Sequence, residues 1–175
     1  GNTVKSIADG SIQPEQNIGL MAEGIKNPIA PGTIVWNKTN FEIENYGTID
    51  FSAAQKSTAI YANSARVLND GEIRIGENST GIYGFYDVNT RKYDGITLNK
   101  VEVETTANSK ISLNKNSVGM YLKDVEKVTN LGGSIESIDR TEKNVGIYAV
   151  NSDKKLVMDS KTDITLGDGS VGIYS

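Results

Sequence analysis

The stretch Val145-Gly146-Ile147-Tyr148-Ala149 decides the fold, because the chain returns to it again and again. Related stretches stand at 58–62, 80–84, 118–122 and 171–175, and a weaker copy with Met in place of Tyr stands at 18–22. Six copies of one short apolar strand in 175 residues are typical of a repeat protein whose units pack on one another. We therefore expect a stacked, repetitive all-β protein.

The spacing of the copies indicates the size of one repeat. The Gly or Ala of each copy stands at position 19, 59, 81, 119, 146 or 172, so successive intervals are 40, 22, 38, 27 and 26 residues. A strand rises about 3.3 Å per residue, and the shorter intervals therefore suit one coil of three short strands and three bends. A strand repeat of this length, without helical periodicity, predicts a β-solenoid of about six coils.

Two further segments precede each copy. One alternates apolar and polar residues, as in Gly71-Glu72-Ile73-Arg74-Ile75, which places one face inward and the other in water. Its isoleucines are expected to stack as a column inside the coil: Ile49, Ile73, Ile111, Ile135 and Ile164. The other segment ends in an Asn-x-Gly bend, as in 41–47, and we expect its corner asparagines to hydrogen-bond from coil to coil.

Alternation also assigns the two faces of the repeated strand. We expect Val145, Ile147 and Ala149 to point inward, although the reverse facing, with Gly and Tyr inside, satisfies the same alternation. With the first facing, an outward stripe of tyrosines follows: Tyr61, Tyr83, Tyr121, Tyr148 and Tyr174. Cross-strand contacts of about 0.2–1 kcal/mol each favour mutual stabilisation of these rings over direct ligand contact.

Two long intervals carry insertions, at about residues 23–40 and 84–96. The second is expected to contain a protruding β-hairpin from Asp87 to Asp94. Both insertions leave the coil after the repeated strand, and insertions on one side of a solenoid often form its binding face. The candidate ligand contacts are aromatic side chains with planar polar groups nearby: Trp36, Phe85, Tyr86, Asp87, Asn89, Arg91 and Tyr93. The alternative is a pair of loops that only cover the core.

The composition excludes several classes of function. A net charge of −4, with Lys and Arg interspersed among Asp and Glu, argues against a nucleic-acid partner. The chain has no His and no Cys, so a thiolate zinc site, a catalytic triad and an imidazole base are all excluded. No apolar run is long enough to span a membrane, and isolated Asp-Gly pairs favour bends over calcium sites. We expect no metal and no cofactor.

The strands Ser79–Tyr83, Ser117–Tyr121 and Ser170–Tyr174, with the Asn-x-Gly-x-Ile bend, carry a family resemblance. In these residues the chain resembles the passenger regions of large autotransporter adhesins from fusobacteria and their relatives. The resemblance implies a right-handed parallel β-helix, carried by type V secretion to the outer face of the bacterial outer membrane. It also implies an adhesin for host or bacterial glycans or receptors. A start at Gly1 without a signal peptide indicates a section of a longer passenger, with adjoining coils as neighbours.

Two other protein classes share some of these features. The stretch 116–119 echoes the heads of trimeric autotransporter adhesins, but those heads repeat at about half the present period. Parallel β-helices also include polysaccharide lyases and hydrolases, which cluster carboxylates with Arg or Lys on one face. Here the repeated strand carries no outward carboxylate, and Arg66, Arg74, Arg91 and Arg140 fall in different segments. The prediction is a non-catalytic adhesin segment; a structural stalk and a polysaccharide-cleaving enzyme are the alternatives.

Overall fold

The computed structural model describes residues 3–5, 14–23, 43–63, 65–86, 92–93, 96–97, 102–125, 127–150 and 158–175. Sheet I contains β1 (Thr3–Lys5), β4 (Thr48–Phe51), β7 (Glu72–Ile75), β12 (Lys110–Leu113), β15 (Ser134–Ser137) and β18 (Asp163–Thr165). Sheet II contains β2 (Ile18–Glu23), β5 (Thr58–Asn63), β8 (Thr80–Phe85), β13 (Val118–Lys123), β16 (Val145–Val150) and β19 (Val171–Tyr174). Sheet III contains β3 (Ile43–Asn45), β6 (Arg66–Asn69), β11 (Glu102–Thr105), β14 (Lys127–Leu131) and β17 (Met158–Ser160).

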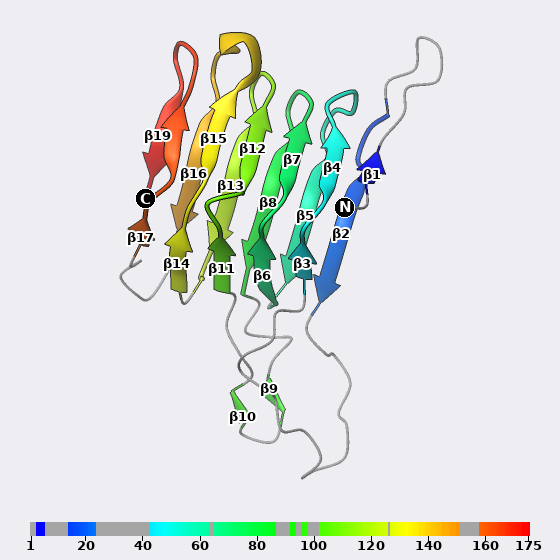
Figure 1. Cartoon of the computed structure of the whole chain (residues 1–175). Helices are drawn as coiled ribbons and strands as arrows, with labels where there is room; N and C mark the ends of the chain where they lie inside the picture. Colours follow the sequence, from blue (N-terminus) through cyan, green and yellow to red (C-terminus); the bar gives the residue numbers. More distant parts are fainter. Residues whose placement is uncertain are drawn as a thin grey trace.

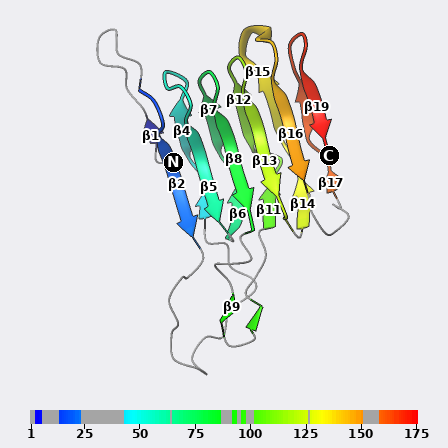
Figure 2. The same cartoon turned by 180° about the vertical axis from the view of Figure 1, so that it is seen from behind.

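Each full coil contributes one strand to each sheet, in the order III, I, II, and the next coil repeats that order (Figure 1). All pairs within the three sheets are parallel, so backbone hydrogen bonds run along the axis of the stack. The strands of the first and last coils lie at opposite ends of the row, as both views show (Figure 2). The predicted parallel β-helix with three strands per coil is confirmed. A single 3-10 turn (η2, Ile138–Arg140) interrupts the strands of the described residues.

The second predicted insertion contains an antiparallel hairpin of β9 (Lys92–Tyr93) and β10 (Ile96–Thr97). It lies beyond the edges of the three sheets, on the side where the strands of sheet II end (Figure 1). These two strands lie at 92–93 and 96–97, toward the C-terminal side of the predicted centre at Asp87 to Asp94. The first predicted insertion, at about 23–40, lies outside the described residues except for Glu23, which ends β2.

The interior of the helix is an apolar column built from equivalent levels of successive coils. Ile49, Ile73, Ile111 and Ile135 pair in register across sheet I, and each is no more than 1% exposed. Ile164 continues the column in the last coil, where it is half-buried. Sheet II faces this column with Ile60, Ile82, Met120 and Ile147, also buried. Burial of each such side chain stabilises the fold by about 1.5–3 kcal/mol.

The strict alternation expected for the repeated strand is wrong at its glycine. Ile147 and Ala149 point inward and Tyr148 points outward, but Val145 is half-buried and Gly146 is buried. A Cβ placed on Gly146 would approach the Ile164 side chain at 2.9 Å, so this position also faces the interior. Two successive residues therefore face the core, and the registered partners skip the glycine level. The irregularity explains why a residue without a side chain recurs there.

Buried polar side chains link the coils at their corners. In a serine–asparagine ladder, the side chain of one coil accepts the backbone N–H of the coil before it. The distances from N to the side-chain oxygen are 2.8–3.2 Å, and the ladder runs through Asn17, Ser57, Ser79, Ser117, Asn144 and Ser170. The ladder accounts for the Ser or Asn that begins each repeated motif.

The predicted asparagine corner is also confirmed. The Asn45 amide donates to the Asn69 side-chain oxygen at 2.7 Å, and the Asn69 amide donates to the Ser109 hydroxyl at 2.6 Å. Asn45 and Asn69 are buried, so these bonds form away from water, where an unpaired amide would be costly. The Asn-x-Gly bend thus provides both a turn and a lateral link between coils.

Candidate binding surfaces

The outer side of sheet II, here called the tyrosine face, carries a continuous stack of aromatic rings. Tyr61, Tyr83, Tyr121, Tyr148 and Tyr174 occupy the same level of five successive coils. Adjacent ring centroids are 5.7, 4.9, 5.0 and 4.8 Å apart, with interplanar angles between 3° and 11°. Because parallel strands in register fix this separation, the stack follows directly from the coil repeat.

The stacked arrangement determines what the tyrosines can offer a ligand. Each interior ring is covered on both faces by its neighbours, so its edge and hydroxyl group remain for contact. Tyr83 is held mainly in a neutral state, because burial raises its pKa and the neighbouring Tyr121 and Tyr61 raise it further. A neutral phenol both donates and accepts hydrogen bonds. The face therefore presents a row of phenol hydroxyl groups, one per coil.

Phe85 extends the aromatic surface toward the hairpin side. Its ring meets Tyr61 and Tyr83 edge-to-face, with centroids 5.5 and 5.3 Å apart. Three valines, each three residues before the tyrosine of its strand, pair with one another in register: Val118, Val145 and Val171. In the described residues the tyrosine face is thus mostly apolar and aromatic, with Lys123 as an exposed charge at its edge. Exposed apolar surfaces of this kind often mark interaction sites.

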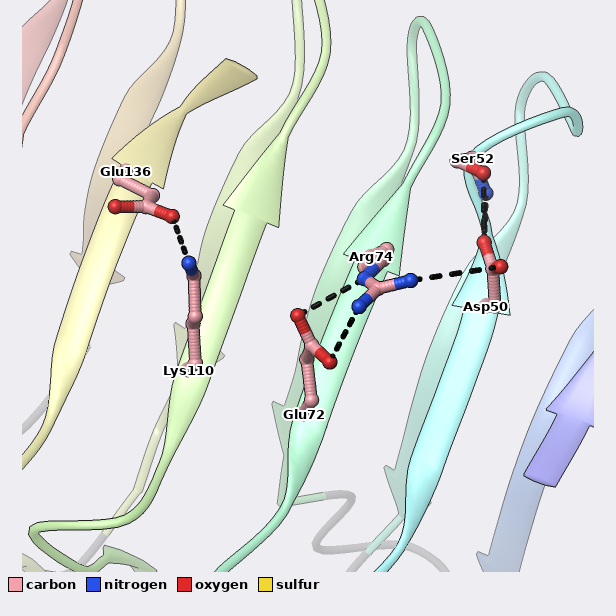
Figure 3. Close-up of polar contacts among 6 residues, drawn as sticks. All are labelled: Asp50, Ser52, Glu72, Arg74, Lys110 and Glu136. Carbon is pink, nitrogen blue, oxygen red and sulfur yellow. Dashed lines mark hydrogen bonds and ion pairs between the residues drawn. The ribbon is translucent and has the colours of Figure 1, made fainter.

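The outer side of sheet I, here called the charged face, has the opposite character (Figure 3). Arg74 makes two hydrogen bonds with Glu72, at 2.9 Å from Nε and 2.7 Å from Nη2, and its Nη1 lies 3.9 Å from Asp50 Oδ2. In the next coils, Lys110 Nζ lies 2.5 Å from Glu136 Oε1. Each pair has at least one partner in contact with solvent, so each contributes little to stability. Two of these ion pairs join neighbouring coils, namely Asp50 with Arg74 and Lys110 with Glu136.

Two ionisable groups on the charged face, Asp50 and Arg74, have pKa values shifted by their neighbours. Burial alone would raise the pKa of Asp50, but hydrogen bonds from the Ser52 hydroxyl and amide and the charge of Arg74 outweigh it, so the pKa is lowered. The hydrogen bond with Glu72 raises the pKa of Arg74. A general acid for glycosidic cleavage needs a raised carboxyl pKa, and a general base needs a group that loses its proton. The lowered pKa makes Asp50 unsuited to the acid role, and the raised pKa makes Arg74 unsuited to the role of base.

The carboxylate–arginine cluster on sheet I was missed by the sequence prediction. Asp50, Glu72 and Arg74 lie in two coils and look unrelated along the chain. The alignment of Ile49 with Ile73 places Asp50 directly opposite Arg74, and this register was the signal that could have revealed the cluster. The repeated strand carries no outward carboxylate, and the charges lie on the strand that precedes it in each coil, β4 or β7.

The predicted ligand residues are only partly within the described structure. Phe85 packs on the tyrosine stack, and Tyr86 is half-buried against the apolar core, with its amide donating to the Lys123 carbonyl at 3.1 Å. Tyr93 belongs to β9. The remaining candidates lie outside the described residues: Trp36, Asp87, Asn89 and Arg91. Their role in binding stays a prediction, and Phe85 is the candidate that joins the hairpin side to the tyrosine face.

Comparison with known families agrees with this fold. A family model described as the BigA third pectate lyase-like domain matches residues 2–174. The chain belongs to this family. The BigA third pectate lyase-like domain is a β-helix-type domain of a large bacterial surface protein, which agrees with the three stacked parallel sheets. No curated protein and no solved structure matched the chain.

The described residues of this pectate lyase-like domain contain neither a membrane-spanning helix nor a metal-binding cluster. None of its described helices has the length and apolar character needed to cross a bilayer. Within the same residues, no group of three or more Asp, Glu, His or Cys side chains is arranged to hold a metal ion. The features that remain for function are the two outer faces and the hairpin side.

Proposed function

We propose that this domain is a non-catalytic segment of a bacterial surface adhesin that binds glycans on host or bacterial cells. The observation that carries the proposal is the tyrosine face, an aromatic surface that spans five coils and lies against Phe85 on the hairpin side. Membership in a family named for a domain of a large surface protein supports exposure to such partners. Display on the outer membrane by an autotransporter pathway is part of the same proposal.

A glycan suits the chemistry of this face. Hydroxyl groups of a sugar can exchange hydrogen bonds with the phenols, while its C–H surfaces pack on the valines and on Phe85. The strand spacing is close to the length of one hexose in an extended polysaccharide, so a chain lying along the axis meets one phenol per residue. A protein receptor is the second candidate partner, because interfaces are also enriched in Tyr.

The state of the charged face supports a non-catalytic role. Glycoside hydrolysis requires two carboxyl groups with different pKa values placed on either side of the scissile bond. Asp50 and Glu72 instead share Arg74, and Glu136 is paired with Lys110. Cleavage of pectin, hyaluronan or chondroitin by the purified domain would overturn the non-catalytic part of the proposal.

The binding surface is tested by removing the hydroxyls while keeping the rings. A triple variant with Tyr83→Phe, Tyr121→Phe and Tyr148→Phe retains the stack, so its circular dichroism spectrum should match the wild type. We expect it to lose at least tenfold in attachment, measured on a glycan array and on intact cells. The matched control is Arg74→Gln on the charged face, which should bind as the wild type does.

A separate variant distinguishes the hairpin side from the tyrosine face. Trp36→Ala removes the candidate in the first insertion and leaves every tyrosine of the stack in the sequence. Loss of attachment in this variant alone would move the site to the insertions. Unchanged attachment in Trp36→Ala and in the triple variant together would contradict binding by this domain and favour a structural stalk.

A further inference from the structure

The tyrosine face holds the phenol rings of neighbouring coils one strand spacing apart. The ring centroids of Tyr83 and Tyr121 are 4.9 Å apart with an interplanar angle of 3°, and those of Tyr121 and Tyr148 are 5.0 Å apart with an angle of 11°. These distances are close to the separation of paired strands, about 4.7–4.9 Å. Each ring is therefore related to the next mainly by a shift along the axis, so the carbons ortho to the two hydroxyl groups are also neighbours.

The same rings can be reached from solution. Tyr83, Tyr121 and Tyr148 point outward from sheet II and are half-buried, so part of each phenol remains in contact with solvent. The chain has no Cys, so no thiol competes with the phenols for an oxidant and no disulfide joins the coils. The tyrosine face thus combines accessible, oxidisable rings with a fixed pairwise arrangement.

Tyr46 shows the contrasting arrangement of a phenol outside the tyrosine face. Its side chain is 59% exposed, and its hydroxyl group donates a hydrogen bond to Glu44 Oε2 at 3.1 Å. Within the described residues it makes no contact with another aromatic ring. Tyr46 is therefore at least as accessible as the stacked tyrosines but lacks their ring neighbours, which makes it an internal control.

From this geometry we infer that the tyrosine face is a site of oxidative cross-linking, at which phenols of adjacent coils join as dityrosine. The oxidant is hydrogen peroxide acting through an external peroxidase, which removes one electron and one proton from each phenol. The two phenoxyl radicals form a carbon–carbon bond between their ortho positions, and each ring regains its hydroxyl proton as its ortho proton is lost. Two phenols and one hydrogen peroxide thus yield one dityrosine and two water molecules.

Proximity favours coupling within the stack over coupling between molecules. Two radicals held side by side react as in an intramolecular step with a high effective concentration. The rings must tilt toward each other to form the bond, and outward side chains are freer to do so than side chains in a close-packed core. Tyr61 and Tyr83 are the least favourable pair, because their centroids are 5.7 Å apart and Phe85 lies edge-on against both rings. Cross-links are therefore expected mainly through Tyr121.

A dityrosine bond would act in this cysteine-free chain as a disulfide acts elsewhere. Tyr121 and Tyr148 are 27 residues apart in the sequence, so a bond between them closes a loop of one coil and restricts the unfolded chain. Each coil of a solenoid otherwise depends on noncovalent contacts with its neighbours. The family description, a domain of a large bacterial surface protein, agrees with exposure to oxidants outside the cell.

Two double variants with equal numbers of tyrosines test the inference. Tyr83→Phe with Tyr148→Phe separates the remaining phenols of the stack by an intervening ring, whereas Tyr61→Phe with Tyr174→Phe leaves three adjacent phenols. Both variants keep five aromatic rings, so their circular dichroism spectra should match the wild type. After treatment of the dilute chain with peroxidase and hydrogen peroxide, the first variant should form about tenfold less dityrosine within the stack than the second.

Peptide mass spectrometry assigns each cross-link to its residues. In the wild type we expect linked peptides that join Tyr121 to Tyr83 or Tyr148, each with the summed mass less two hydrogen atoms. Links through Tyr46 should occur only in covalent dimers of the chain. The oxidised monomer should unfold at a Tm higher by on the order of 5 °C than the untreated protein, and the variant with separated phenols should show no such gain.

Three outcomes would overturn the inference. One is equal cross-linking within the stack in the two double variants, and another is the absence of any link between stacked tyrosines in the oxidised wild type. The third is a set of links found only in covalent dimers, which would assign the reaction to encounters between molecules. None of these measurements uses a glycan, so cross-linking succeeds or fails independently of the proposed binding function.

Discussion

One residue in each coil adopts a left-handed backbone conformation immediately before the serine–asparagine ladder. Its amide donates to a carbonyl of the following coil, as from Lys143 to Asp168 at 3.0 Å. These residues have φ between 50° and 63°: Gln16, Lys56, Asn78, Asn116, Lys143 and Gly169. Asn and Gly tolerate such angles, but Lys and Gln are strained by about 1–2 kcal/mol. Stacking therefore imposes the corner geometry on residues that do not prefer it.

Replacing a strained lysine with glycine should stabilise the protein. For Lys143→Gly we expect a gain of about 0.5–1 kcal/mol in the free energy of unfolding, because relief of strain exceeds the entropy cost of glycine. Urea titration with fluorescence detection measures the change. The neighbouring Glu142 has no positive φ, so Glu142→Gly is the control and should destabilise by a similar amount. A loss of stability in Lys143→Gly would contradict the argument.

The hydrogen bonds of Asp50 make a small part of the stability depend on pH. A carboxyl whose pKa is lowered by folding stabilises the protein above its unfolded pKa, about 3.9. This contribution is lost as the pH falls through the lower pKa of the folded state. We expect Asp50→Asn to be less stable than the wild type at pH 6, with the difference shrinking at pH 3. Equal differences at both pH values in urea titrations would show that Asp50 makes no such contribution.

At the scale of elements, the serine–asparagine ladder binds sheet II to the corners of neighbouring coils. Ser117 accepts the Ser79 amide at 3.2 Å and donates to the Gly76 carbonyl at 2.8 Å, and it is 1% exposed. Water cannot replace these partners at a buried site, so loss of the hydroxyl leaves a backbone donor unpaired. The ladder should therefore contribute more to stability than the exposed ion pairs of the charged face.

Removing one ladder hydroxyl tests this comparison. We expect Ser117→Ala to lower the free energy of unfolding by about 1–3 kcal/mol, as found for buried unpaired polar groups. Ser52→Ala is the control, because its exposed hydroxyl bond to Asp50 can be replaced by water and should cost less than about 0.5 kcal/mol. Thermal unfolding followed by circular dichroism ranks the two. Similar costs for both variants would argue against the ladder as a major element of stability.

At the scale of the whole molecule, the repeat made the fold predictable from the sequence. A strand that recurs in six coils defines the period, and alternation around Ile73 defines which side of sheet I is buried. The facing of Gly146 was not predictable in this way, because two successive inward residues break the alternation. The pairing of Asp50 with Arg74 required the register between coils, which a search within single segments does not reveal.

The candidate binding surfaces were less predictable than the fold. The tyrosine stripe followed from the repeat, but alternation could not show that adjacent rings cover one another's faces at separations near 5 Å. That geometry depends on side-chain rotation as well as on register. Function is also weakly constrained, because the same β-helix supports binding surfaces and enzymes and differs between them only in outward side chains.

Stacked coils should unfold from the ends of the row rather than all at once. In a solenoid each coil contacts only its neighbours, so a central coil is stabilised by two interfaces and a terminal coil by one. Burial follows this pattern, since Ile111 in a central coil is 0% exposed while Ile164 in the last coil is only half-buried. We expect the amides of β8 and β13 to exchange hydrogen most slowly, and those of β2 and β19 most quickly.

Native-state hydrogen exchange with peptide-level mass spectrometry measures this gradient, and a matched pair of variants tests its cause. Ile111→Val should cost about 0.5–1.5 kcal/mol and accelerate exchange in the coils on both sides of β12. Ile164→Val, the same change in a half-buried position, should cost less and affect mainly β18 and β19. Uniform protection from β2 to β19, with the two variants equally destabilising, would mean that the six coils unfold as one cooperative unit. In that case coupling along the axis would exceed what nearest-neighbour contacts provide, and the end coils would be as stable as the middle.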